Sequence, residues 1–171
     1  MISKRQSSGV QLYTAAERRR RDASHWTLVQ GVLAPLQFLA FFVSLFLVLR
    51  YLGSGQGFTA AAVSVLVKTA LLYTIMVTGS LWERDVFGKY LFAAPFFWED
   101  AVSMLVIALH TAYVAALLAH SLSPRALMLL ALAAYASYVI NAAQFLVKFR
   151  AARLQGAPPR AAGTLAAGAA E

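Results

Sequence analysis

The stretch FFWEDAVSMLVIALHTAY, residues 96–113, decides how the rest of the sequence is interpreted. It opens with two adjacent acids, Glu99 and Asp100, and it continues as an apolar run with His110 inside it. Extended to about residue 120, this run is long enough to cross a membrane. A charged side chain at the centre of a bilayer costs roughly 2.5–3.5 kcal/mol. Polar residues in such a run therefore indicate a buried partner or a function.

The composition is typical of an integral membrane protein. Of the 171 residues, 60% are hydrophobic and only 13% are charged, whereas soluble domains carry about a quarter charged residues. The chain has no cysteine, which excludes disulfides, thiolate nucleophiles and metal–thiolate sites. Its net charge of +8 gathers at the ends of the apolar runs, as topology signals do, and we expect no nucleic-acid partner. No cleavable signal peptide is visible.

Four apolar runs predict an all-α, integral membrane four-helix bundle. We expect spans at about residues 26–51, 58–82, 96–120 and 125–149, within one transmembrane domain of residues 26–150. Ser123 and Pro124 are typical of a helix start, as N-cap and first helical residue. Positive charge flanks one side of the bundle, so we expect both termini in the cytoplasm.

The two ends of the chain differ from the middle. Residues 1–25 predict a cytoplasmic basic segment with a short interfacial helix, because Thr14 and Glu17 have the spacing of a capping box. The arginines of residues 18–21 either face anionic headgroups, anchor the topology or attract an acidic substrate. Residues 151–171 are rich in Ala, Gly and Pro, and we expect a disordered tail.

Polar side chains recur at helical spacing along all four spans. We consider them candidate substrate-binding residues, with hydrogen bonds that only hold the bundle together as the alternative. They are Gln30, Gln37, Lys68, Tyr73, Glu83, Ser103, Tyr113, Asn141, Gln144 and Lys148. At about 1.5 Å of rise per residue, Lys68 and His110 fall near the midplane and the acids toward the cytoplasm. This predicts a cleft that opens to the cytoplasm, with Lys68 and His110 at its floor.

The adjacent acids are the candidate catalytic residues, together with His110. Two neighbouring carboxyl groups that are shielded from water repel each other, so at least one is expected to hold a proton. A protonated carboxyl group of this kind can act as a general acid. The alternative for each acid is plain exposure to solvent at the membrane surface. For His110 the alternatives are a hydrogen-bonded core residue or an axial ligand to a metal-centred tetrapyrrole.

Several long strings resemble the 3-vinyl (bacterio)chlorophyllide hydratase family of phototrophic bacteria. The resemblance covers roughly residues 12–154. Its strings are Leu12-Tyr13-Thr14, residues 18–22, WTLVQGVLAPLQF at 26–38, Lys68-Thr69, LYTIMVTG at 72–79, FFWED at 96–100, HTAY at 110–113 and YVINAAQF at 138–145.

The resemblance implies addition of water to the C3-vinyl group of chlorophyllide a, or of its bacteriochlorophyllide equivalent, in bacteriochlorophyll synthesis. It implies a hydro-lyase with no redox cofactor, acting on a substrate that carries its own magnesium. It also implies a multi-pass protein of the bacterial inner, or intracytoplasmic, membrane, surrounded by lipid. Other enzymes of the pathway and further copies of the chain are expected as possible partners.

The chemistry of vinyl hydration suggests roles for the residues. We expect Glu99 to be the acid and Asp100 its electrostatic partner, or the reverse, and His110 to be the base or a ligand to the substrate magnesium. The amide side chains would orient water and the ring substituents, and Lys148 would meet the propionate. The alternative functions are a non-catalytic tetrapyrrole carrier and a small transporter that uses Lys68 and His110.

Overall fold

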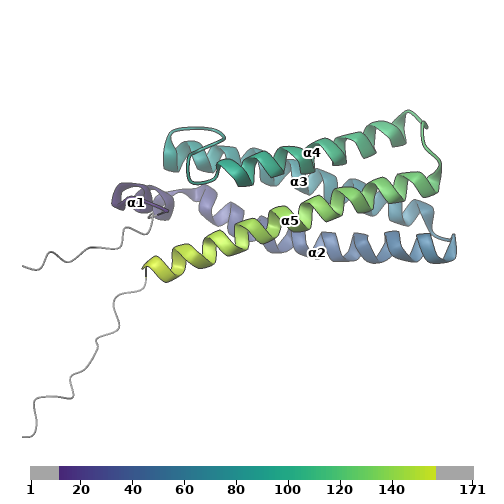
Figure 1. Ribbon diagram of the computed structural model, residues 1–171, viewed down its shortest axis with the longest axis horizontal. Helices are drawn as coiled ribbons and strands as arrows, with labels where there is room; N and C mark the ends of the chain where they lie inside the picture. The colour runs from purple at the N-terminus through teal and green to yellow at the C-terminus, as the bar shows by residue number, and fades with distance from the viewer. Residues whose placement is uncertain (1–11, 157–171) are drawn as a thin grey trace, which may run out of the picture.

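The structure, a computed structural model, describes residues 12–156, and every element in that range is helical. Figure 1 shows the five helices, whose bounds are α1 Ala15–Ala23, α2 His25–Ser54, α3 Phe58–Phe87, α4 Phe97–Leu118 and α5 Pro124–Gly156. The all-α prediction is confirmed for these residues. Residues 1–11 and 157–171, which include most of the predicted tail, lie outside the described range.

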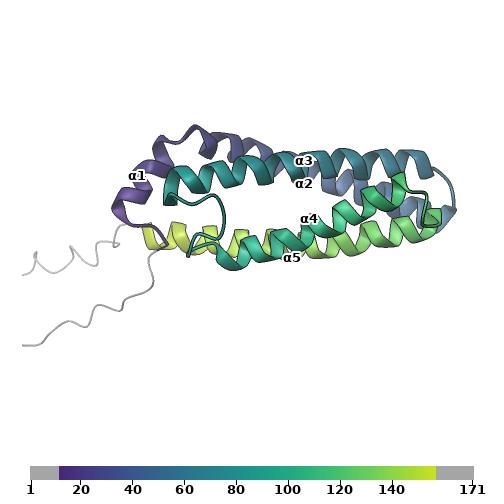
Figure 2. The same ribbon diagram turned by 90° about the horizontal axis from the view of Figure 1, so that it is seen from above.

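The long helices form two antiparallel hairpins. One consists of α2 and α3, and the other of α4 and α5, and the two hairpins lie side by side along the length of the molecule (Figures 1 and 2). The turn between α2 and α3 needs left-handed backbone at Gly55 and Gly57, with φ of 72° and 84°, which glycine adopts without a steric cost. As a result, α1 and the described end of α5 lie at the same end of the bundle.

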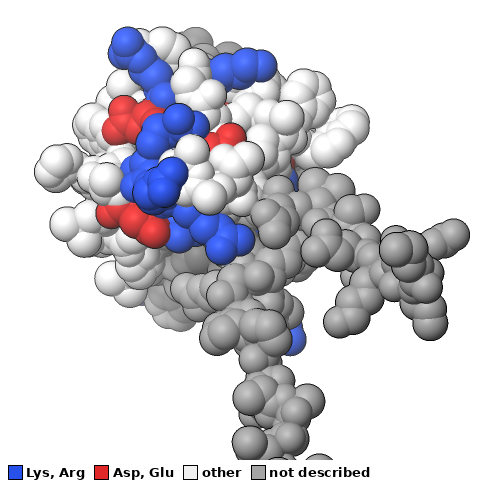
Figure 3. Space-filling view, turned by 90° about the vertical axis from the view of Figure 1, so that its left-hand side faces the viewer, with Lys and Arg blue, Asp and Glu red and all other residues white. Residues whose placement is uncertain are grey.

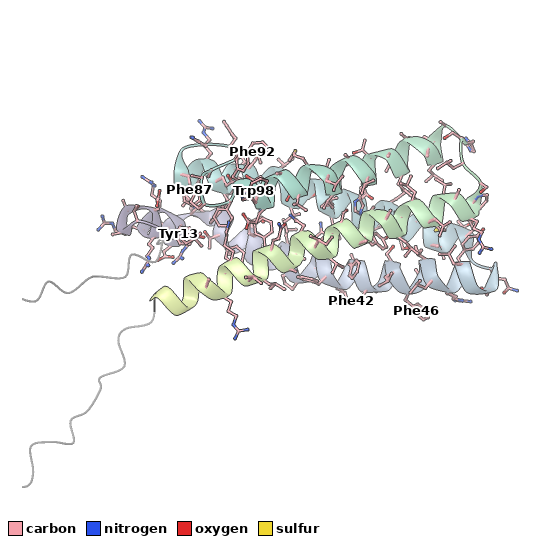
Figure 4. All side chains as sticks on the ribbon, viewed as in Figure 1. Tyr13, Phe42, Phe46, Phe87, Phe92 and Trp98 are labelled. Atoms are coloured by element: carbon pink, nitrogen blue, oxygen red, sulfur yellow. The ribbon has the colours of Figure 1, made fainter. Side chains whose placement is uncertain are left out.

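Helices α2 to α5 are each long and apolar enough to cross a membrane, which agrees with the four predicted spans. Their outward faces carry large hydrophobic side chains. Phe42 and Phe46 of α2, for example, are mostly exposed and point away from the bundle (Figure 4). Contiguous apolar surface of this extent is typical of a protein that faces lipid.

The helix boundaries follow capping chemistry more than hydropathy. Helix α3 continues five residues past the predicted end of its span, because the charged residues that end the apolar run do not end the helix. Gly88 ends it in a left-handed conformation, with φ of 77° and its N–H bonded to the Arg84 carbonyl at 2.9 Å. The predicted start of α5 is confirmed, since Pro124 is its first residue and the Ser123 hydroxyl accepts from the Ala126 N–H at 3.3 Å.

Helix α1 is joined to the end of the bundle. Its predicted capping box is present: the Thr14 hydroxyl accepts from the Glu17 N–H, and the Glu17 carboxylate accepts from the Thr14 N–H. Tyr13 is buried and stacks on Phe87 with ring centres 5.8 Å apart (Figure 4), and burial raises the pKa of its hydroxyl to about 12. Arg20 donates to the Val86 carbonyl at 2.8 Å. The N-terminal segment therefore packs against the end of α3.

Candidate active site

Three acidic side chains are buried together at the end of the bundle that carries α1. Glu83 comes from the last turns of α3, and Glu99 and Asp100 come from the first turn of α4. Only 5%, 6% and 3% of their surfaces are exposed. We call these three residues the carboxyl cluster. An isolated buried charge costs several kcal/mol, so each of these groups needs a partner.

Glu99 is paired with a cation. The Lys148 ammonium of α5 forms an ion pair with the Glu99 carboxylate and also donates to the Pro95 carbonyl. The Lys148 side chain is still partly exposed, so the pair lies at the edge of the protein interior. The Lys148 ammonium thus compensates a negative charge on Glu99 directly.

Asp100 and Glu83 form a different kind of pair. Backbone N–H groups of the loop between α3 and α4 donate to both, from Phe92 to Asp100 at 2.6 Å and from Ala93 to Glu83 at 3.2 Å. Because Phe92 and Ala93 are neighbours in the chain, the two carboxyl groups lie next to each other. Two buried carboxylates side by side repel each other when both are ionised, so one of the two is expected to hold a proton. This pair is therefore the candidate buried proton donor.

Two further predicted residues join α5 to α4 beside the carboxyl cluster. The Asn141 amide donates to the Glu99 carbonyl at 2.9 Å and to the Ser103 hydroxyl at 3.0 Å. Ser103 in turn donates to the Glu99 carbonyl at 2.8 Å. The Gln144 side-chain oxygen, one turn farther along α5, is buried and has no hydrogen-bond partner.

A second group of predicted residues lies deeper in the bundle and contains polar atoms without a hydrogen-bond partner. Gln37, Lys68, His110 and Tyr113 are all buried, and Lys68 and His110 have no exposed surface. We call them the buried polar set. Both side-chain heteroatoms of Gln37, the Lys68 nitrogen, the His110 Nε2 and the Tyr113 hydroxyl have no hydrogen-bond partner. Because Lys68 and His110 are fully covered, the predicted opening from the cytoplasm does not reach them in this conformation.

Two more predicted residues, Gln30 and Tyr73, lie apart from both groups and from the residues beside the carboxyl cluster. Gln30 donates to the Thr78 hydroxyl at 2.7 Å, so it connects α2 to α3, as the structural alternative predicted. Tyr73 faces outward, with 37% of its surface exposed. Its hydroxyl bonds to the Thr111 hydroxyl at 2.7 Å across the outer surface between α3 and α4.

The sequence did not single out the aromatic residues that flank the carboxyl cluster. Phe92, Phe97 and Trp98 are exposed. The ring centres of Phe92 and Phe97 are 5.6 Å apart, and those of Phe97 and Trp98 are 5.4 Å apart. Figure 4 shows Phe92 and Trp98. We call them the aromatic surface. Phe92 has φ of 58°, which is uncommon for a bulky residue. Its N–H bonds to Asp100, so one residue joins the aromatic surface to the proton donor.

Comparison with known proteins gives the family of this chain. The family model described as 2-vinyl bacteriochlorophyllide hydratase matches residues 13–151. The chain belongs to the 2-vinyl bacteriochlorophyllide hydratase family. A hydratase of this name from Rhodobacter capsulatus is 64% identical over 154 residues, 90% of this chain and 89% of the relative. One from Cereibacter sphaeroides is 64% identical over 144 residues, 84% of this chain and 89% of the relative.

No solved structure matches this member of the 2-vinyl bacteriochlorophyllide hydratase family. The predicted resemblance is confirmed, and the matched range contains the whole carboxyl cluster, the buried polar set and the aromatic surface. The roles predicted for single residues remain predictions.

Proposed function

We propose that this protein adds water to the vinyl group of a chlorophyllide-type pigment, as a hydro-lyase in bacteriochlorophyll synthesis. The observation that carries this proposal is the 64% identity to two vinyl hydratases over most of their length and of this chain. The vinyl group numbered 2 in the family name is the one numbered 3 in the newer numbering of the ring. Within the described residues, the carboxyl cluster supplies the acid chemistry that such a reaction requires.

We further propose that the carboxyl cluster lies at the cytoplasmic side of the bacterial inner membrane, with both chain ends in the cytoplasm. Lys and Arg side chains gather on the end of the molecule that carries α1 (Figure 3). Such an excess of Lys and Arg marks the cytoplasmic side of membrane proteins. A pigment that reaches the membrane from the cytoplasm would then meet the carboxyl cluster first.

The proposed acid is the Asp100–Glu83 pair, which transfers its proton to the terminal carbon of the vinyl group. The positive charge then forms on the carbon next to the macrocycle, where conjugation delocalises it. Water bonds to that carbon and releases one proton, which returns to the carboxyl pair. The net change is addition of one water molecule, and the acid is restored for the next turnover.

Glu99 is a poorer candidate for the acid than the sequence suggested. Its ion pair with Lys148 favours the anion, and an anion near the reacting carbon stabilises the carbocation instead. The Lys148 ammonium is committed to this pair, which argues against a free propionate receptor at that residue. Asn141 and Ser103 hold α4 and α5 together at this level, and so keep the acids in position.

The aromatic surface is the proposed contact for the flat face of the pigment. Rings that stack on a conjugated macrocycle contribute about 1 kcal/mol each beyond the area they bury. A pigment stacked on Phe92 and Phe97 would lie close to Asp100, because the Phe92 ring packs against Phe97 and the Phe92 N–H bonds to Asp100. The reaction needs no redox cofactor, and we propose that the only metal involved is the magnesium that the substrate carries.

Incubation of membranes that contain this protein with chlorophyllide a tests the proposed function. The expected product is heavier by one water molecule and absorbs at shorter wavelength in the red, since hydration removes the vinyl group from the conjugated system. Membranes without the protein serve as the control. Pigment that binds but is recovered unaltered would contradict the hydratase proposal and would indicate a carrier instead.

A further inference from the structure

The buried polar set takes no part in the proposed proton transfer. Burying its unpartnered atoms nevertheless costs free energy of folding. It presents five nitrogen or oxygen atoms that are buried without a hydrogen-bond partner. Each such atom costs about 1–3 kcal/mol relative to a satisfied one. These atoms belong to four residues on three helices. We take their lack of partners to indicate a ligand that forms hydrogen bonds with them when it is bound.

The walls around these atoms are aromatic. The Lys68 nitrogen lies 3.6 Å from the centre of the Tyr138 ring, and the His110 ring lies 5.9 Å from that of Tyr135. Phe41 contacts both tyrosine rings, at 5.5 and 5.2 Å. Among the described residues the Lys68 ammonium has no acidic partner. A flat conjugated ligand fits these walls better than a small hydrated ion does.

The hydrogen-bonding capacity of these polar atoms indicates which kind of ligand atom they would contact. Lys68, the Gln37 amide and the Tyr113 hydroxyl can all donate a hydrogen bond. His110 donates from Nδ1 to the Val106 carbonyl at 2.8 Å, so in the neutral ring Nε2 presents a lone pair. The Lys68 nitrogen, which lies over the Tyr138 ring and has no hydrogen-bond partner, favours an oxygen acceptor on the ligand. An uncharged carbonyl costs far less to bury at this depth than a carboxylate does.

The position of the buried polar set relates it to the acid. His110 follows Asp100 by ten residues on α4, which corresponds to about 15 Å along the helix axis. Lys68 lies over the ring of Tyr138 and His110 lies beside that of Tyr135, three residues away on α5. A chlorin macrocycle is a rigid plate that carries its vinyl group at one edge and a ring ketone at the opposite edge. One bound molecule can thus reach both sites.

We propose that Lys68, in the buried polar set, binds the ring ketone of the pigment, at the edge opposite to the vinyl group. This inference rests on the proposed function, because it assumes the same pigment. Since Lys68 is fully covered, binding requires the helices around it to separate.

The test is the carbonyl stretching frequency of the ring ketone in bound pigment, measured by infrared spectroscopy on the full-length Asp100→Asn protein, which is expected to bind without turnover. We expect the ketone band to shift to lower frequency on binding. Adding Lys68→Met should abolish most of the shift and weaken pigment binding about tenfold or more. Lys89→Met, which removes an exposed lysine of the α3–α4 loop, is the matched control and should change neither.

An unshifted ketone band in the bound pigment, or a shift that Lys68→Met leaves intact, would overturn the inference. A pigment analogue whose ring ketone is replaced by a methylene group provides a test without a protein variant. It should bind about tenfold more weakly or worse than the ketone, and equal affinity would also overturn the inference. Absence of any pigment binding by the unsubstituted protein would instead contradict the proposed function.

Discussion

The carboxyl cluster and the buried polar set solve the problem of polar groups in an apolar bundle in opposite ways. Every acid of the carboxyl cluster has a partner: Glu99 has Lys148, and Asp100 and Glu83 each accept from a backbone N–H group. The buried polar set has five heteroatoms without one. The difference teaches that the carboxyl cluster is organised before a ligand binds. The buried polar set, in contrast, obtains hydrogen-bond partners from the ligand.

The largest effect is expected when the carboxyl pair is broken. Glu83→Gln leaves Asp100 without its carboxyl neighbour and should reduce the rate of hydration about a hundredfold, within the usual range for loss of general acid catalysis. The rate is measured by loss of the vinyl pigment's red absorption. Asp85→Asn, an exposed acid two residues farther along α3, is the control and should retain the full rate. Equal rates for both variants would remove Glu83 from the mechanism.

The next effect concerns the ion pair of the carboxyl cluster. Lys148→Met leaves the Glu99 carboxylate buried without a cation and should lower the free energy of unfolding by about 3 kcal/mol. The double substitution Glu99→Gln with Lys148→Met should recover most of that loss, because no charge is then left unpaired. Chemical denaturation in detergent measures both, with the exposed Arg150→Met as the control. If Lys148→Met alone is as stable as the unsubstituted protein, the buried Glu99 carboxylate does not need Lys148 as a partner.

For the buried polar set the sign of the stability change is reversed. Without pigment, Lys68→Met replaces an unpaired buried amine by an apolar side chain of similar length and should raise the free energy of unfolding by about 1–3 kcal/mol. The same denaturation measurement checks this, with Lys89→Met as the control. If Lys68→Met destabilises the pigment-free protein instead, Lys68 has a partner within the chain and the contrast between the two regions fails.

The smallest effect is expected at the aromatic surface. Phe92→Gly keeps the N–H that bonds to Asp100 and removes the ring, and it also relieves the cost of a positive φ at a bulky residue. The KM for pigment should rise about fivefold for the lost ring contact, which corresponds to about 1 kcal/mol, while kcat stays near its original value. An unchanged KM would mean that the Phe92 ring does not contact the pigment.

The sequence was sufficient to predict the helices, but it could not predict which polar groups meet. Hydropathy located four spans, and the Thr14–Glu17 and Ser123–Pro124 patterns gave the helix starts, because these signals are local. Glu99 and Asp100 looked like one pair because they are adjacent. On a helix, however, they point about 100° apart, so Glu99 meets α5 and Asp100 meets the loop between α3 and α4.

The remaining differences have the same origin in tertiary contacts. The N–H groups that hold Asp100 and Glu83 belong to Phe92 and Ala93, and backbone donors of a loop leave no pattern in a sequence. The sequence placed Lys68 near the midplane, but it could not show that the Lys68 nitrogen lies over the face of Tyr138. The spacing of Glu83 on the polar stripe of its span was the one signal that pointed toward the carboxyl pair.

The central claim is that the Asp100–Glu83 pair, and not the ion-paired Glu99, donates the proton. The most direct measurement is the single-turnover rate of chlorophyllide a hydration by Asp100→Asn and by the Glu99→Gln/Lys148→Met double variant, each compared with the unsubstituted protein in the same membranes. We predict a loss of at least about a hundredfold for Asp100→Asn and a loss smaller than about tenfold for the double variant. Full activity of Asp100→Asn, together with an inactive but folded double variant, would contradict the account.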